Sequence, residues 1–138
     1  MKEAGSRIII DKLLRESGWV MPGDHGKVNV EPELSNKKGE ADYVLMDARG
    51  YPLCVIEAKR DLKSPLDGKE QARGYANSLD CRFIILYNGI QHYLWDLEQG
   101  SPFIIDKFPS QKQLELRKTK FNPPTYEDEP ISENYIGL

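Results

Sequence analysis

Apolar positions near the start of the chain recur at the spacing of an α-helix. These positions are Ile9, Ile10, Leu13 and Leu14, an i, i+4 pattern that places them on one helix face. Ser6 is a residue type that favours an N-cap, and Ser17-Gly18 is typical of a helix end. We therefore predict an amphipathic helix over residues 6–17.

The periodicity weakens after this helix. Pro22-Gly23 is typical of a turn, and Lys27–Glu31 favours a short strand. The next residues, Pro32–Gly39, are polar, so we predict a loop there.

Two apolar stretches in the centre of the chain predict a β-hairpin. They are Ala41–Met46 and Leu53–Ala58, and the residues between them, Asp47–Pro52, include the turn residue Gly50. This is the clearest local signal in the sequence.

Helix and strand signals follow one another in the second half. A helix is predicted from Asp67-Gly68 to about Leu79, and Asn88-Gly89 is a signal for a type I′ turn. The strand-like stretches are Phe83–Tyr87, Gln91–Leu97 and Phe103–Ile105. This order of elements predicts an α/β fold with a mixed central β-sheet flanked by helices.

The character of the chain changes after Pro109. Gln111–Arg117 favours a short helix, whereas Lys118–Leu138 is polar and contains Pro123-Pro124. We predict one domain over residues 1–109, followed in residues 110–138 by a short helix and a tail or linker toward a downstream region.

Three residues of the predicted hairpin carry candidate chemistry. Glu57 and Lys59 are two apart on a strand, so both point to the same face about 7 Å apart. If the turn is centred on Arg49-Gly50, Asp42 lies across from Glu57 with Cβ atoms about 5 Å apart. A turn one residue longer or shorter would spoil this arrangement.

This geometry suits a Mg²⁺ site. Asp42 and Glu57 can supply carboxylate oxygens, and the carbonyl of Ala58 a third oxygen, which are the hard ligands that Mg²⁺ prefers. A bound metal would lower the pKa of a water ligand and neutralise charge on a scissile phosphate. Lys59 could then orient that water or stabilise the transition state.

Each residue also has an ordinary interpretation. A Glu-x-Lys pair on a strand is usually solvated, and an aspartate that opens a strand is commonly an edge or turn residue. The combination favours a site because Glu57 and Lys59 interrupt the end of a very apolar strand.

The helix that follows adds two candidates. Gln71 and Tyr75 are i, i+4 and share a helix face, so both could contact a phosphate backbone. The alternative for Tyr75 is that it packs the helix on the sheet together with Ala72, Ala76 and Leu79.

The distribution of charge along the chain is more informative than its net charge. The 138-residue chain has a net charge of −3 and a pI near 5.5, which argues mildly against nucleic-acid binding by bulk electrostatics. A basic segment that contains Lys59, Arg60 and Lys63 contrasts with the acidic Tyr126–Glu129. A local basic face can bind DNA while the sum stays negative, so Arg60 and Lys63 are candidate DNA contacts.

The cysteines and histidines of the sequence predict neither a metal site nor a catalytic site. Cys54 and Cys81 lack metal-ligand spacing and are expected to be reduced, buried thiols, and His25 and His92 have no nucleophile at motif spacing. The sequence has no apolar run of about 20 residues and no signal peptide, so we expect a cytoplasmic protein without a membrane span.

Several motifs together resemble a known family. They are Ala41–Leu45, Gly50–Arg60, Gln71–Ala76, Tyr87–Gly89 and Tyr93–Asp96. In this order they resemble the N-terminal PD-(D/E)xK nuclease domain of the restriction (R) subunit of type I restriction enzymes, over residues from about 3 to 96.

The resemblance implies a restriction-endonuclease-like core that cleaves DNA with Mg²⁺. Asp42 matches the motif's aspartate, and Glu57 and Lys59 match its Glu-x-Lys. Gln71 and Tyr75 match the Gln-x-x-x-Tyr element that distinguishes this family within the superfamily.

The resemblance also implies features outside these motifs. Glu3 resembles an acidic residue of the first helix near the metal. Complete R subunits resemble helicases downstream and act with specificity and methylation subunits, whereas this chain has no Gly-x-x-x-x-Gly-Lys-[Ser/Thr] motif. The chain is therefore expected to be an excised domain or a free-standing relative.

Alternatives stay open at this point. A module of the same fold could bind DNA or a partner without cutting, and a protein-interaction domain would explain the acidic end. RNA cleavage on the same scaffold is compatible with the residues.

Overall fold

The domain is a three-layer α/β arrangement, seen in a computed structural model that describes residues 4–58 and 65–121. Six strands form one sheet in the order β1-β2-β3-β4-β5-β6. Strands β3 and β4 are parallel and all other neighbours are antiparallel, so the sheet is mixed. The predicted fold class is confirmed. None of the helices in the described residues is long and apolar enough to cross a membrane.

The helices and strands have the following bounds. They are α1 (Ala4–Glu16), β1 (Val30–Asn36), β2 (Gly39–Met46), β3 (Pro52–Ala58), the 3₁₀ turn η1 (Pro65–Gly68), α2 (Lys69–Ser78), β4 (Phe83–Tyr87), β5 (His92–Asp96), β6 (Phe103–Ile105) and α3 (Gln111–Phe121).

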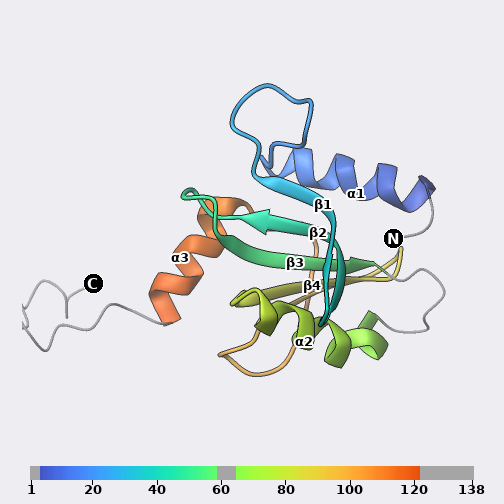
Figure 1. Ribbon diagram of the computed structural model, residues 1–138, viewed down its shortest axis with the longest axis vertical. Helices are drawn as coiled ribbons and strands as arrows, with labels where there is room; N and C mark the ends of the chain where they lie inside the picture. Colours follow the sequence, from blue (N-terminus) through green and yellow to red (C-terminus); the bar gives the residue numbers. More distant parts are fainter. Residues whose placement is uncertain (1–3, 59–64, 122–138) are drawn as a thin grey trace, which may run out of the picture.

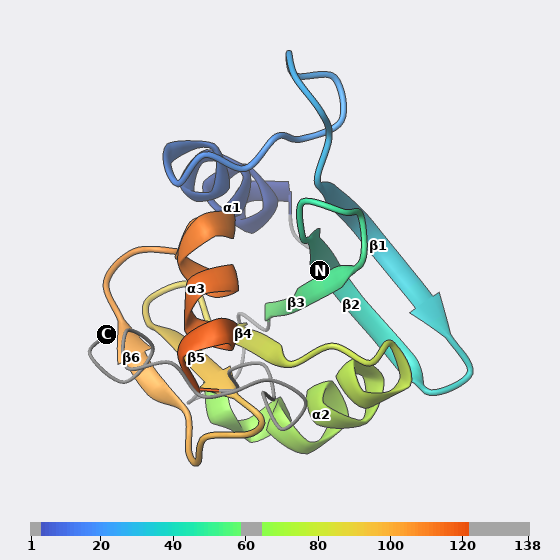
Figure 2. The same cartoon turned by 90° about the vertical axis from the view of Figure 1, so that its left-hand side faces the viewer.

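Helices α1 and α3 cover one face of the sheet, and α2 covers the other (Figure 1, Figure 2). On the first face, Ile10 and Leu14 of α1 and Leu114 of α3 belong to one apolar cluster with Tyr43 and Ile56. Because the central strands have a helix on each face, both sets of alternating side chains are buried. This explains why β3 and β4 read as continuous apolar runs.

The α2 face has its own apolar cluster. Ala72, Tyr75 and Ala76 lie on the buried side of the helix and pack with Val44 and Val55 of the sheet. The predicted helix from Asp67-Gly68 corresponds to the end of η1 followed by α2.

The central hairpin has the predicted register. Tyr43 pairs with Ile56, Val44 with Val55 and Leu45 with Cys54, before a bulge near Met46. The ladder ends at Tyr43–Ile56, one residue before Asp42 and Glu57. Next to the turn, Met46 pairs with Pro52, so the turn differs by one residue from the predicted one and the bulge restores the register.

Two predictions near the N-terminus are wrong. Helix α1 includes Ser6, so this residue is not its N-cap. The predicted loop Pro32–Gly39 is instead most of β1 and the start of β2. An edge strand needs apolar residues on one side only and tolerates proline, which is why β1 has the polar sequence of a loop.

Two predictions in the second half also need correction. Tyr87 pairs with His92, so the loop has four residues, Asn88–Gln91, and is not a two-residue type I′ turn. The Asn88 side chain shapes this loop by accepting hydrogen bonds from the Ile90 and Gln91 N–H groups. Helix α3 extends to Phe121, so the chain is helical beyond the predicted end at Arg117.

Candidate active site

Strand β2 changes direction at Asp42. Ala41 belongs to the cluster on the α2 face and Tyr43 to the cluster on the α1 face, although residues two apart on a regular strand share a face. Opposite this point on β1, Glu33 has a φ of 54° and the β1–β2 ladder passes from Pro32–Tyr43 directly to Leu34–Ala41. The alternation of side chains between the two faces is therefore interrupted at Asp42, with no extra residue in either strand.

The carboxylate of Asp42 is fixed by the main chain of β3. The last residue pair of the β2–β3 ladder is Tyr43–Ile56, and beyond it the Ala58 N–H donates a 2.7 Å hydrogen bond to Asp42 Oδ2. Asp42 is only 4% exposed. The Ala58 nitrogen is two covalent bonds from the Glu57 Cα. Asp42 Oδ2 therefore lies within about 5.6 Å of the Glu57 Cα.

Glu57 opens onto a cleft on the α2 face. Its neighbours Ile56 and Ala58 belong to the cluster of the opposite face. The cleft measures about 640 Å³ and lies between α2 and the tip of the β1–β2 hairpin. Its lining residues are Ser35, Asn36, Lys37, Lys38, Gly39, Glu40, Glu57, Glu70, Gln71 and Gly74. We call it the Glu57 cleft.

The donor set fits a hard cation with few protein ligands. Asp42 and Glu57 offer carboxylate oxygens close to the main chain of Ala58. Within residues 4–58 and 65–121, no three His, Cys, Asp or Glu side chains are grouped to hold a metal. Mg²⁺ commonly binds through one or two carboxylates and completes its shell with water and phosphate, so two carboxylates suffice.

The two candidates on α2 lie in different surroundings. Gln71 is exposed and lines the Glu57 cleft. Tyr75 is 1% exposed and packs with Ala72 and Ala76, and burial raises the pKa of its phenol. The packing interpretation is therefore favoured for Tyr75, and a direct DNA contact is not.

Four predicted site residues lie outside the residues that the structure describes. They are Glu3, Lys59, Arg60 and Lys63.

A buried ion pair at the end of the sheet opposite Asp42 was not predicted from the sequence. Arg82 Nε and Nη2 donate hydrogen bonds of 2.8 and 3.1 Å to the two carboxylate oxygens of Asp96. Arg82 Nη1 also donates to the carbonyl of Lys118, at 3.3 Å, which ties α3 to the sheet. The available signal was the antiparallel pairing of Phe83 with Asp96, which places Arg82 beside that carboxylate.

The interactions of Tyr43 were not predicted from the sequence either. The Tyr43 hydroxyl donates a 2.6 Å hydrogen bond to Asp11 of α1, and burial raises its pKa. The predicted states of the cysteines agree with the structure, because Cys54 and Cys81 are free and buried. His25 is exposed in a loop and His92 lies on β5.

Comparisons with known proteins agree with this architecture. The fold is similar to that of a solved fragment described as an HsdR subunit of a type I restriction enzyme from Vibrio vulnificus YJ016, with a TM-score of 0.68 and 24% identity. The similarity covers 88% of this chain but only 26% of the solved chain. No curated protein matches the sequence.

The sequence itself identifies the family. Residues 8–109 match the family described as the type I restriction enzyme R protein N terminus, and this range contains Asp42, Glu57, Gln71 and Tyr75. The fold is consistent with the predicted restriction-endonuclease-like core. The chain belongs to the family of type I restriction enzyme R protein N termini.

Proposed function

We propose that this domain is the DNA-cleaving module of a type I R subunit and hydrolyses phosphodiester bonds with Mg²⁺. One observation supports the proposal: a buried aspartate, Asp42, accepts a hydrogen bond from the Ala58 N–H, next to Glu57, which lines a cleft.

Each residue of the proposed site has a separate role. Asp42 binds the cation with a carboxylate that the Ala58 N–H already orients, and Glu57 binds it from the side of the cleft. The Ala58 carbonyl is the proposed third oxygen. Bound Mg²⁺ would lower the pKa of a water ligand and stabilise negative charge on the phosphate.

The remaining roles follow from the sequence or from the cleft. Lys59, two residues after Glu57, is proposed to orient the attacking water, and Arg60 and Lys63 to contact the DNA backbone. Gln71 is placed to hydrogen-bond phosphate or water, because it is exposed on the wall of the Glu57 cleft. Glu3 stays a peripheral candidate on the basis of the resemblance alone.

The proposed activity belongs to a larger assembly. The chain corresponds to 26% of the solved HsdR chain, and it contains no phosphate-binding motif of a motor. We propose that a downstream helicase-like region moves the DNA and that specificity and methylation subunits select it, in the cytoplasm. Recognition of a base sequence is not assigned to this domain.

Removing the carboxylates tests the proposal. Cleavage of supercoiled plasmid with Mg²⁺ should fall at least about 10²-fold in both Asp42→Asn and Glu57→Gln, since both lose a charged ligand. Asp47→Asn is the matched control, because Asp47 is also buried but caps the turn at the other end of the hairpin through the Arg49 and Tyr51 N–H groups.

Mg²⁺ titration by calorimetry gives a second readout. Wild type should bind weakly and Asp42→Asn should not. Unchanged binding and cleavage in Asp42→Asn would refute the proposed ligands. If the wild-type domain, tested within the assembled enzyme, binds DNA but does not cut it with Mg²⁺, the alternative is supported: a non-catalytic DNA-binding module of the same fold.

A further inference from the structure

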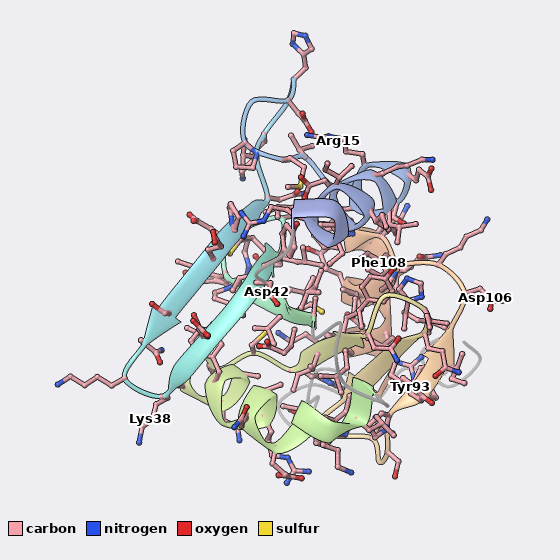
Figure 3. All side chains as sticks on the ribbon, turned by 90° about the vertical axis from the view of Figure 1, so that its right-hand side faces the viewer. Arg15, Lys38, Asp42, Tyr93, Asp106 and Phe108 are labelled. Carbon is pink, nitrogen blue, oxygen red and sulfur yellow. The ribbon has the colours of Figure 1, made fainter. Side chains whose placement is uncertain are left out.

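The tip of the β1–β2 hairpin forms one wall of the Glu57 cleft. Its contribution runs from Ser35 to Glu40, and α2 forms the facing wall through Glu70, Gln71 and Gly74. Lys37 and Lys38 occupy the turn and are exposed. Figure 3 shows Lys38 at the end of the hairpin, pointing away from the domain, whereas Asp42 lies in the interior.

Hydrogen bonds hold this hairpin on α2. Asn36 Nδ2 donates to Ser78 Oγ at 3.0 Å, and Ser78 Oγ donates to the Tyr75 carbonyl at 2.6 Å. The Asn36 side chain also accepts the Lys38 N–H at 2.7 Å, which shapes the turn itself. The tip is therefore fixed relative to the helix that carries Gln71.

Close packing adds to these hydrogen bonds. Gly39 follows the turn at a φ of +147°, and a Cβ atom there would lie 3.4 Å from the Cβ of Tyr75. The positive φ favours glycine here, and the 3.4 Å spacing is that of an ordinary van der Waals contact between the hairpin and Tyr75. The buried ring of Tyr75 is thus part of the surface on which the hairpin rests.

Charged side chains of both signs line the cleft. Among the described residues of its lining, Glu40, Glu57 and Glu70 are acidic, and Lys37 and Lys38 are basic. Arg73 lies one helical turn after Glu70 on α2. Its guanidinium is 3.5 Å from the Glu70 carboxylate and 4.6 Å from the centre of the Trp95 ring.

We infer that Lys37 and Lys38 contact the phosphate backbone of the DNA substrate, and that α2, through Tyr75 and Ser78, positions the hairpin for this contact. The inference rests on the proposed function, since it takes DNA as the substrate. In this inference, the two residues of the Gln-x-x-x-Tyr element have different roles. Tyr75 positions the hairpin, and Gln71 lines the cleft.

Duplex binding without cleavage tests the lysines. Anisotropy of a labelled duplex of about 20 base pairs is measured in Ca²⁺ over a salt series, on wild type and on Lys37→Ala/Lys38→Ala. Loss of two phosphate contacts should weaken binding about tenfold or more at low salt and reduce the slope of log K against log salt by about 2. The control Lys107→Ala/Lys112→Ala makes the same charge change at exposed lysines near β6 and α3, and should have little effect.

A pair of Tyr75 variants tests the positioning role. Tyr75→Phe keeps the buried ring and should bind like wild type, whereas Tyr75→Ala should approach the double lysine variant. A loss in Tyr75→Phe would show a direct contact by the hydroxyl and overturn the positioning role. Tyr75→Ala is compared only if its circular dichroism shows a folded protein, and otherwise Ser78→Ala, which removes the Asn36 contact, takes its place.

The outcomes separate the two proposals. Equal binding by the two double lysine variants, or no duplex binding by wild type at low salt, overturns the hairpin contact. Lysine-dependent binding would support the contact, and absence of cleavage in the assembled enzyme would then reject only the nuclease.

Discussion

Two buried aspartates at opposite ends of the sheet differ in what surrounds them. Asp96 is 2% exposed and forms a two-bond ion pair with Arg82, whose side chain is 4% exposed. Asp42 is 4% exposed and accepts the Ala58 N–H, beside a second acid, Glu57. Burial is similar, but one carboxylate has a buried guanidinium and the other has an acidic neighbour on the edge of a cleft.

The comparison teaches that neighbours, not burial, distinguish a structural acid from a candidate catalytic acid. Asp96 and Arg82 neutralise each other and anchor α3 through the Lys118 carbonyl. Asp42 instead accepts a main-chain N–H and lies near Glu57, which lines a cleft. Perturbing both aspartates in the same way therefore gives a direct test.

The largest effect on stability is expected at Asp96. Asp96→Asn leaves Arg82 buried without its counter-charge, which should cost about 3–5 kcal/mol of unfolding free energy. Urea unfolding followed by circular dichroism measures this. Glu98→Gln is the control, since Glu98 is 3.7 Å from the same guanidinium but 55% exposed. A cost of Asp96→Asn below about 1 kcal/mol would contradict a structural role for the pair.

A smaller effect on stability is expected from the same substitution at Asp42. In Asp42→Asn the amide oxygen of the new side chain can still accept the hydrogen bond from the Ala58 N–H. The unfolding free energy should therefore stay within about 1 kcal/mol of wild type. The same urea titration measures it. If the two aspartate-to-asparagine variants lost equal stability, the proposed distinction between the two acids would fail.

The smallest effect concerns pH. His92 stacks on Tyr87 with ring centroids 4.5 Å apart and contacts Phe108 edge-on, and burial lowers its pKa although Asp106 opposes the shift. The unfolded chain therefore binds this proton more readily. The contribution of His92 to the free energy of unfolding is fully present above about pH 6.5. It is lost as the pH falls through the pKa of His92 in the folded state.

Replacing each of the two histidines in turn measures this contribution. His92→Phe keeps an aromatic ring between Tyr87 and Phe108, and its stability should fall less than that of wild type between about pH 7.5 and about pH 5. His25→Gln changes the exposed histidine and should follow the wild-type curve. A His92→Phe curve parallel to wild type would show that this side chain does not contribute.

The centre of the fold was predictable because its signals are local. Strands β3 and β4 are covered on both faces and need continuous apolar sequence. The pairs from Tyr43–Ile56 to Leu45–Cys54 have the predicted register, although a bulge at Met46 makes the turn differ from the predicted one. The edge strand β1 was missed because the partner strand, not its own residues, determines its structure. The extension of α3 beyond Arg117 is likewise supported by a distant contact, from Arg82 to the Lys118 carbonyl.

The candidate site was predictable only in part. The predicted register holds up to the pair Tyr43–Ile56, next to Asp42 and Glu57, but the sequence gave no sign that the alternation of faces is interrupted at Asp42. The i, i+4 spacing of Gln71 and Tyr75 could not separate an exposed residue from a buried one. The wall formed by Lys37 and Lys38 depends on a hairpin that the sequence presented as a loop.

The two cysteines give each layer of the domain its own chemical reporter. Cys54 belongs to the apolar cluster under α1 and α3, and Cys81 to the cluster under α2. Burial raises the pKa of both thiols, so few thiolates are available in the folded protein. Each cysteine can then be alkylated only after the helices on its own face of the sheet separate from it. Comparing the two labelling rates by mass spectrometry would show whether the helices leave the sheet together or one layer at a time.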